Sequence, residues 1–403
     1  MITSHQPQVA IPPQIMVCDR IDSWAYNTIN QRLSVLCRRI ISENNFTSEI
    51  VEKLLLLADD LPEGKVRSIA RSPHMNAPDL ADWDRYVQPY LGKSWLEIPW
   101  YFAEAYFYRR VLEAVDYFNL SIDPYILQKR LGIEQSITSI QGLSARVNQL
   151  AGQWKIADFI YLVYCALWGN RVDLSLWPAE QGDRSSIASD NERVNLLVDQ
   201  TQTLTEHLVK NPGQQIDFIN DNAGFELFCD LCLADYLLTT QMAKSVTFHL
   251  KAHPTFVSDA MIKDVHQTLE MLAAENNQDV KNLANRLQTH IKLSRLDLVA
   301  DIFWNSPLVF WEMPDHLRQE FAKANLIIVK GDANYRRLLG DCHWEFTTPF
   351  PEIVSYFPSP VVALRTMKAE LACGLPAGLP EKLTFEDPEW LTNGQRGVIQ
   401  FVP

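Results

Sequence analysis

The sequence predicts an α/β protein in which an N-terminal helical region precedes a three-layer αβα sandwich with a largely parallel sheet. Two observations support this fold class. Up to about residue 180, apolar residues recur at three- and four-residue spacing, and strand signals are nearly absent. After the polar, turn-rich segment 181–193, short runs of Val, Ile and Phe alternate with amphipathic stretches. We therefore expect a loose tail at residues 1–15, a helical region at 16–190 and the αβα domain at 191–403.

Hydrophobic periodicity locates the individual elements. In the first half, the helical pattern covers residues 24–43, 47–58, 100–118, 139–152 and 155–168. In the second half, β-type runs occupy residues 216–219, 245–250, 326–329 and 361–364, and helical patterns cover 261–274 and 280–293. Strand–helix alternation is typical of parallel sheets that are covered on both faces. The chain has 403 residues, of which 47% are apolar, so it can form one large or two closely associated domains.

The charge balance argues against several classes of partner. The formal net charge is −13, from 36 basic and 49 acidic residues, and no basic run is present. Because such a chain repels phosphate backbones and anionic lipids, we expect neither nucleic acid nor membrane as a partner. The N-terminus lacks the pattern of a signal peptide, and no apolar stretch is long enough to cross a bilayer. Seven scattered cysteines fit reduced thiols, so a cytoplasmic location is expected.

Polar side chains follow each of the four β-type runs. Asp221 and Asn222 follow the first run, and Asp259 comes shortly after the second. The third is followed by KGDANYRR (330–337) and the fourth by RTMK (365–368). An Asp-Asn pair alone is most often a turn or a helix cap, but the carboxyl ends of parallel strands share one crevice. Asp and Asn oxygens suit a hard divalent ion, whereas Lys and Arg suit phosphate, so the pattern predicts metal-assisted phosphoryl transfer to water.

Other polar arrangements are expected to be structural. His249 and His253 have HxxxH spacing, but the first lies in a predicted strand and no Glu follows it, unlike the helical zinc motif. Glu226 and Asp230 lie one helical turn apart, and their repulsion would be relieved by a nearby metal or cation, so either support of the metal site or plain solvation fits this pair. The sequence contains no GxSxG elbow, no GxxxxGK[ST] loop and no GxGxxG after a strand. Serine hydrolase, P-loop and dinucleotide-binding functions are therefore disfavoured.

Residues 94–110, SWLEIPWYFAEAYFYRR, form an unusually aromatic segment. We interpret it as a core helix packed under the sheet, because aromatic side chains bury large apolar surfaces. Its charged residues are candidate contributors to the crevice: Glu97, Glu104 and Arg109.

Six motifs occur in order between about residue 90 and residue 373: PWYFAEAYFYRR, WGNRVDLS, DFINDNAGFELFCDL, FVSD, KGDANYRRLLGD and LRTMKAE. Together they resemble the damage-control phosphatase family, in the branch marked by an Arg-Thr-x-Lys motif. The resemblance implies a helical N-terminal region, a three-layer αβα domain and a phosphatase that depends on a divalent metal ion, manganese, nickel, cobalt or magnesium. It also implies that the partner is a small phosphorylated metabolite, typically a sugar phosphate such as fructose-1-phosphate or fructose-6-phosphate.

The resemblance further implies roles for individual residues. The metal ligands would be Asp221, Asn222 and Asp259. The substrate contacts would be Asp332, Asn334, Tyr335, Arg336 and Lys368. The catalytic residues would be Asp221, Asp259 and Lys368. Family members have an arginine in an early helix bordering the pocket, and Arg32 is its counterpart here, although Ser34 stands where proline is usual. Glu97, which lies in the aromatic segment, is a further candidate substrate contact.

The sequence leaves two catalytic routes open. In both, the metal binds one phosphoryl oxygen while Lys368 and Arg336 neutralise the others. Either a metal-activated water attacks and Asp221 or Asp332 takes its proton, or Asp221 itself attacks and forms an aspartyl-phosphate.

The alternative function is a different enzyme class, an S-adenosylmethionine-dependent carboxyl (glutamate) O-methyltransferase. One member of the same branch is named for this activity. Against it, no glycine-rich loop follows the first predicted strand, and methyl transfer has little need of three oxygen ligands for a metal. A non-enzymatic metabolite-binding protein would be expected to lack a metal ligand, and none of the three is missing.

Overall fold

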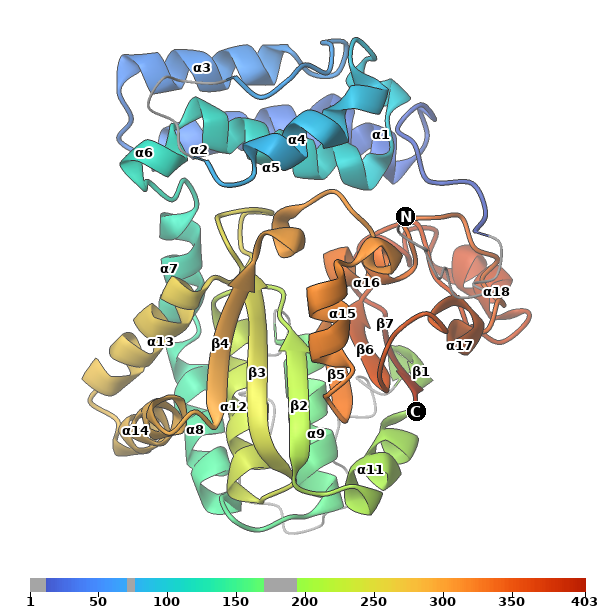
Figure 1. Ribbon diagram of the computed structural model, residues 1–403. Helices are drawn as coiled ribbons and strands as arrows, with labels where there is room; N and C mark the ends of the chain where they lie inside the picture. The colour runs from blue at the N-terminus through green and yellow to red at the C-terminus, as the bar shows by residue number, and fades with distance from the viewer. Residues whose placement is uncertain (1–11, 71–76, 170–193) are drawn as a thin grey trace.

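A seven-stranded sheet forms the centre of the C-terminal part of the chain (Figure 1). The structure is a computed structural model that describes residues 12–70, 77–169 and 194–403. The strands are β1 (Leu196–Asp199), β2 (Gln214–Ile219), β3 (Ala243–Lys251), β4 (Leu296–Asp301), β5 (Leu326–Lys330), β6 (Val361–Thr366) and β7 (Gly397–Val402). Their order across the sheet is β1-β7-β6-β5-β2-β3-β4. Strands β6, β5, β2, β3 and β4 are parallel, whereas β7 is antiparallel to β6 and parallel to β1.

The predicted αβα architecture with a largely parallel sheet is confirmed. The four expected strands correspond to β2, β3, β5 and β6, while β1, β4 and β7 were not predicted. Strand β4 lies at an edge of the sheet and leaves several residues exposed, so its sequence LDLVAD lacks a continuous apolar run. Strand β7, GVIQFV, is a buried apolar run that was not predicted as a strand, and it pairs with β1 and β6.

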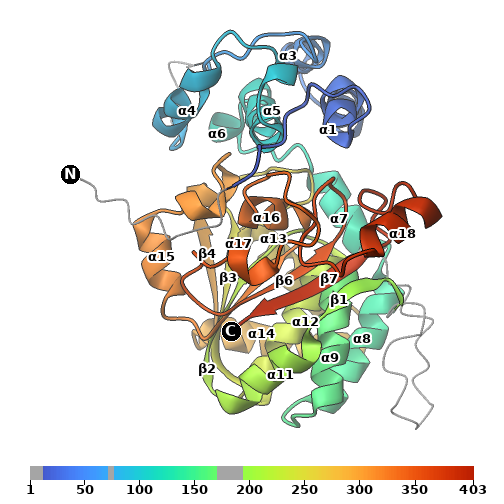
Figure 2. The same ribbon diagram turned by 90° about the vertical axis from the view of Figure 1, so that its right-hand side faces the viewer.

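Alternate residues of the central strands are buried in two different cores. In β5, Leu326 and Ile328 belong to one apolar cluster, whereas Ile327 and Val329 belong to the other. The first cluster contains residues of α8 (Ile137–Leu150), α9 (Ile156–Trp168), α11 (Thr201–Lys210), α12 (Phe225–Thr239), α13 (Ile262–Ala274) and α14 (Gln278–Lys292). The second contains residues of η5 (Ile302–Asn305), η6 (Phe310–Glu312), α15 (Asp315–Phe321), α16 (Asp332–Leu338), α17 (Phe350–Ile353) and α18 (Leu379–Glu386). Helices therefore cover both faces of the sheet (Figure 2).

A helical cap lies beyond the carboxyl ends of the parallel strands (Figures 1 and 2). We define the cap as residues 24–120. It contains α1 (Trp24–Asn27), a π-helical turn η1 (Thr28–Arg32), α2 (Leu33–Glu43), α3 (Ser48–Asp59), α4 (Leu80–Val87), η2 (Gln88–Tyr90), η3 (Trp95–Glu97), α5 (Trp100–Ala114) and α6 (Tyr117–Leu120). In α5 every residue except Glu113 is buried, so the aromatic segment does form a core helix. It faces the carboxyl edge of the sheet, rather than lying under it.

The sequence predicted one helical region over residues 16–190, but in the structure the last helices of this region are not part of the cap. Helix α7 (Ile126–Glu134) leads away from the cap, and α8 and α9 pack against α12 and α14 on the sheet. Helical periodicity does not indicate which surface a helix covers, so the sequence grouped α8 and α9 with the cap helices. The predicted seam at 181–193 and most of the predicted tail at 1–15 lie outside the described residues. Within the described ranges, no helix has both the length and the apolar character needed to span a membrane.

Candidate metal and phosphate site

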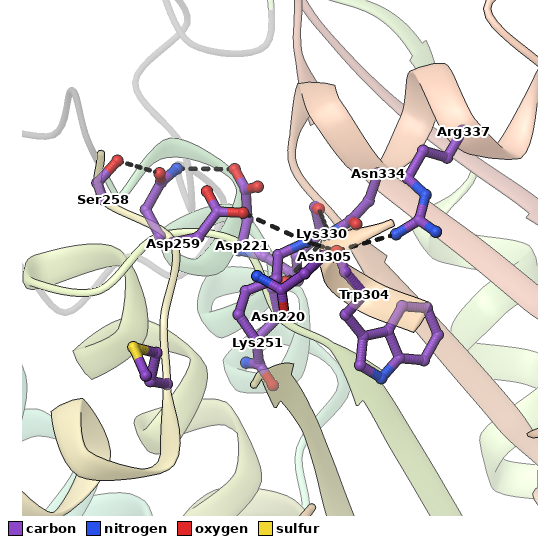
Figure 3. A network of polar contacts seen from close by, with 12 residues as sticks. Asn220, Asp221, Lys251, Ser258, Asp259, Trp304, Asn305, Lys330, Asn334 and Arg337 are labelled. Carbon is purple, nitrogen blue, oxygen red and sulfur yellow. Dashed lines mark hydrogen bonds and ion pairs between the residues drawn. The ribbon is translucent and has the colours of Figure 1, made fainter. Parts of the chain in front are cut away.

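The loops after β2 and β3 lie side by side at the carboxyl edge of the sheet (Figure 3). Asn222 forms an antiparallel bridge with Asp259, and the Ala260 N–H donates to the Asp221 carbonyl at 2.8 Å. Backbone pairing thus brings Asp259 to Asp221 and Asn222, although more than thirty residues separate Asp259 from this pair in the chain. The structure therefore gathers all three predicted metal ligands in one place.

Hydrogen bonds fix the orientation of the Asn222 amide. Its Nδ2 donates to Asp221 Oδ2 at 2.7 Å and to Glu226 Oε2 at 2.9 Å. Its Oδ1 accepts from the Ser258 hydroxyl. Because the amide nitrogen faces two carboxylates, the amide oxygen is turned towards Ser258 and the loop that carries Asp259.

The site concentrates negative charge away from water. Burial, with the neighbouring Glu226 and Asp259 carboxylates, raises the pKa of Asp221 well above its ordinary value, although Lys368 and Lys251 oppose this. Burial also raises the pKa of Asp259, against the effect of Lys251, whose Nζ lies 3.2 Å from Asp259 Oδ2. Ionised carboxylates in such a place are stabilised by an added cation.

The donor atoms fit a hard divalent ion. Among the described residues, no group of three or more His, Cys, Asp or Glu side chains is arranged to hold a metal, so the set depends on the Asn222 amide as well as on two carboxylates. Asp259 Oδ2 is buried and forms an ion pair with Lys251 Nζ. Oxygen ligands from two carboxylates and one amide are typical of magnesium or manganese sites that keep positions open for water and substrate.

Gly331, directly after β5, allows the Asp221 carboxylate to approach the backbone. An ideal Cβ at Gly331 would lie 2.0 Å from Asp221 Oδ2 and 2.2 Å from its Cγ, and the residue has φ +83°. Gly331→Ala is therefore expected to displace Asp221 and to weaken Mn²⁺ binding by about ten-fold or more, a free-energy change of about 1.4 kcal/mol. Isothermal titration calorimetry with Mn²⁺ measures this change.

Gly378 offers a matched control for that variant. It has φ +81°, but an ideal Cβ there would meet nothing within 4 Å. Gly378→Ala should carry a similar backbone strain without altering Mn²⁺ affinity. Equal Mn²⁺ affinity in the two alanine variants would show that the contact between Gly331 and Asp221 has no part in metal binding.

Asp332 and Lys368 lie together beside the carboxylates. Asp332 Oδ1 accepts from Arg365 Nε at 2.7 Å and from the Lys368 backbone N–H at 3.0 Å. The Lys368 side chain is exposed, and its charge lowers the pKa of Asp221. These two predicted residues therefore border the crevice, with a cation accessible to an incoming anion.

Asn334 and Tyr335 point into the protein instead. Asn334 is fully buried, and its Nδ2 donates to the Asn220 and Lys330 carbonyls at 3.0 and 2.9 Å, tying β2 to β5. The Tyr335 hydroxyl donates to Gln400 Oε1 at 2.7 Å in the core. The position of Tyr335 does not support its predicted contact with substrate, whereas Asn334 is held by its Nδ2 and keeps a buried Oδ1 without a hydrogen-bond partner.

Arg336 joins the cap to the sheet domain. Its Nε and Nη2 donate to Asp341 at 2.7 and 3.1 Å, its Nη1 pairs with Glu104, and its guanidinium lies 3.7 Å from the Trp100 ring centroid. These buried carboxylates raise the pKa of Arg336, although burial lowers it. Its charge is therefore neutralised within the protein, and the predicted role in binding phosphate is not supported by its position.

The two predicted residues from the cap also differ in placement. Arg32 is exposed and packs on the Trp24 ring at 4.7 Å, and the Trp24 backbone N–H donates to Glu370 Oε2 at 2.8 Å, close to Lys368 in the chain. Glu97 is exposed and closes a capping box with Ser94, whose backbone N–H it accepts at 2.7 Å. The Glu97 carboxylate therefore caps the N-terminus of η3 and is not brought to the crevice.

A buried cation lies beneath the metal ligands. Lys330 Nζ lies 2.9 Å from Asp230 Oδ1 and 3.3 Å from Glu226 Oε1 (Figure 3 shows Lys330 beside Asn220). The expectation that a cation relieves the repulsion between Glu226 and Asp230 is confirmed. Burial raises the pKa of Asp230 to about 6, while Lys330 lowers it. Sequence reasoning missed Lys330 as a support of the site, although a lysine at the carboxyl end of the apolar run LIIV was the available signal.

Comparisons with known proteins identify the family of the chain. Residues 28–383 match the family described as the damage-control phosphatase ARMT1-like domain. The chain belongs to this family. Damage-control phosphatase ARMT1 from Bos taurus is 32% identical over 98% of this chain and 99% of its own length, and that from Rattus norvegicus is 34% identical over the same shares. The expected family and its phosphatase class are thus confirmed.

A solved structure also aligns with this damage-control phosphatase. It is a DUF89 family protein from Pyrococcus horikoshii, with 16% identity and a TM-score of 0.48 over 92% of this chain and 95% of that chain.

The two histidines of the predicted HxxxH pair have structural roles in this damage-control phosphatase. His249 Nε2 lies 3.1 Å from Asp217 Oδ2, within the sheet. The His253 carbonyl accepts from Asn305 Nδ2 at 2.8 Å, at the beginning of the loop after β3.

The loop that carries Asp259 is strained. Phe256 and Val257 have φ values of +44° and +66°, and the Ser258 N–H donates to the Phe256 carbonyl at 2.8 Å. This bond closes a γ-turn with positive φ, a rare conformation, and Val is a β-branched residue that seldom adopts it. Each such residue costs on the order of 1–3 kcal/mol, so surrounding contacts must hold the loop in place.

Proposed function

We propose that this member of the damage-control phosphatase family hydrolyses the phosphomonoester of a small sugar phosphate, such as fructose-1-phosphate or fructose-6-phosphate. A divalent ion bound by Asp221, Asn222 and Asp259 would support the reaction. The observation that carries the proposal is the close approach of the two loops that bear Asp221, Asn222 and Asp259. The two carboxylates have raised pKa, and the charge of the exposed Lys368 acts on Asp221. Family membership supports both the phosphatase class and the dependence on a metal.

The bound ion would polarise a phosphoryl oxygen and lower the pKa of water. Lys368 binds the remaining phosphoryl oxygens, since its ammonium group is accessible and close to the carboxylates. Both hydrogen bonds of Asp332 use Oδ1, so its Oδ2 can accept a proton from the attacking water or a hydrogen bond from a sugar hydroxyl. Asp221 is less suited to attack phosphorus, because Asn222 holds its Oδ2 and the residue is buried.

Selection of the sugar is assigned to the cap. Arg32 is exposed and packs on Trp24, whose backbone N–H donates to Glu370 Oε2 at 2.8 Å near Lys368, and its guanidinium can donate to the hydroxyl groups of a polyol or to a second anionic group. The cap would also keep bulk water away from the crevice during the reaction.

A phosphate-release assay tests the proposal. The purified protein is freed of metal with a chelator, then assayed against a panel of sugar phosphates with manganese, nickel, cobalt or magnesium. We expect metal-dependent release of phosphate from at least one ketose phosphate, and weaker release after Lys368→Met although the variant still binds the metal. Lys382→Met, at an exposed lysine of α18, is the matched control and should behave as wild type.

Two results would contradict this function. The first is the absence of metal-dependent phosphate release from every member of the panel. The second is tight binding of S-adenosylmethionine by calorimetry together with methyl transfer to a carboxylate, which would support the methyltransferase instead.

A further inference from the structure

The predicted ligand Asp259 follows directly from the strained turn in residues 256–258. After this turn, the Ala223 N–H donates to the Ser258 carbonyl at 2.6 Å, so the turn sets the path that docks Asp259 against the loop after β2. Phe256 and Val257 would lose their strain by moving to negative φ, and Asp259 would then be displaced. A contact from outside the loop must therefore keep the turn in place.

The cap helix α5 supplies that contact. The Phe256 ring stacks on Tyr101, with centroids 5.7 Å apart and an interplanar angle of 22°, and it packs against Tyr108 at 4.7 Å. Both tyrosines are buried, at 2% and 7% exposure, so neither ring is free to move away. The Tyr101 backbone N–H also donates to Asp341 Oδ2 at 2.9 Å, which fixes this part of α5 to the sheet domain.

A second contact with the cap holds the beginning of the same loop. His253 Nε2 lies 3.6 Å from Asp79 Oδ2, and Arg109 of α5 donates to both oxygens of Asp79 at 2.7 and 3.0 Å. From the sheet side, Asn305 Oδ1 accepts the Ala252 N–H at 2.8 Å. The loop is therefore attached to the cap at both His253 and Phe256.

We propose that Phe256 is a positioning residue through which α5 of the cap holds the strained 256–258 turn, and with it Asp259, in the geometry that binds the metal. This inference rests on the proposed metal site. It makes cap docking and metal binding mutually reinforcing, because a cap that holds the turn strengthens metal binding and a bound metal strengthens cap docking by the same factor. Phe256 acts only through Asp259 and does not touch the metal.

Mn²⁺ binding to three variants tests the proposal. Phe256→Ala removes the ring that α5 holds, and we expect Mn²⁺ affinity measured by calorimetry to fall about ten-fold. Adding Val257→Gly should restore affinity to within about three-fold of wild type, because glycine adopts positive φ without strain. A ring with a merely structural role would give no such rescue. Phe102→Leu, at an α5 ring that packs on Tyr90 at 4.4 Å, is the control and should bind Mn²⁺ as wild type does.

Hydrogen exchange provides a readout that needs no metal. In the metal-free protein, amides of residues 256–260 should exchange about ten-fold faster in Phe256→Ala than in wild type, and the Val257→Gly addition should slow them again. Failure of the wild-type protein to bind Mn²⁺ would contradict the proposed metal site, and the exchange rates would still decide the role of Phe256. Equal exchange rates, unchanged Mn²⁺ affinity in Phe256→Ala, or an equal loss in Phe102→Leu would overturn the proposal.

Discussion

Asp221→Asn is expected to lower phosphatase activity by roughly 10³-fold and to abolish measurable Mn²⁺ binding, because it removes one of two carboxylates from the proposed metal site. The fold should survive, since asparagine has the same shape and its amide oxygen can accept the hydrogen bond that Asn222 donates to Asp221 at 2.7 Å. Burial, Glu226 and Asp259 raise the folded pKa of Asp221 above its unfolded value, so its ionised form opposes folding near neutral pH. The metal-free variant should therefore melt at the same temperature as wild type or at a higher one.

Asp235→Asn is the matched control for that experiment. Asp235 is another fully buried aspartate and accepts from Arg286 Nε and Nη2, both at 2.8 Å, on the far side of the site. This change should lower the melting temperature while Mn²⁺ affinity and activity are retained. A loss of stability in Asp221→Asn equal to that in Asp235→Asn, with metal binding intact, would contradict the role of Asp221.

Arg336→Met is expected to reduce the free energy of unfolding by about 3–5 kcal/mol, the typical cost of removing one partner from a buried ion pair. The change leaves Glu104 and Asp341 without their shared cation, and it removes the guanidinium that packs on the Trp100 ring. Unfolding in urea, followed by circular dichroism, measures the loss. If Arg336 contacted substrate instead, the variant would keep its stability and show a raised KM.

A second substitution separates lost charge pairing from lost packing. Combining Arg336→Met with Glu104→Gln should recover part of the stability, because the neutral amide does not need the missing cation. Absence of any recovery would assign the loss to the packing of Arg336 on Trp100.

The sequence predicted the fold where its signal is local. Strands β5 and β6 are buried on both faces and contain the continuous apolar runs LIIV and VVAL, whereas β2 and β3 appear as short runs rich in Val, Ile and Phe that also hold polar residues. Edge strand β4 mixes apolar and charged residues and has no comparable local pattern, whereas β7, GVIQFV, is a buried apolar run that was missed although its signal is local. The division between cap and sheet helices depends on which apolar faces meet, and no local pattern states this.

The candidate site shows the same division. Residues directly after a strand were placed correctly at the carboxyl edge, as for Asp221 and Asp332, because the topology dictates their position. Residues further along GDANYRR lie on helix α16, where only the first residue borders the crevice and the side chains of 334–336 are buried. A sequence motif alone does not show which face of a helix its residues occupy. The positive φ of Val257 also leaves no signature in the sequence.

All seven cysteines are buried, and they are distributed over both cores. Cys37 and Cys342 belong to the core shared with the cap, whereas Cys165, Cys229 and Cys232 lie in the core on the opposite face of the sheet. Burial raises the pKa of Cys37 and of Cys342 to about 12, so the reactive thiolate is scarce in the folded protein. Alkylation of a given thiol must therefore wait for its own core to open. The alkylation rates of individual cysteines therefore report separately how often each of the two apolar cores, on the cap side and on the opposite face of the sheet, opens.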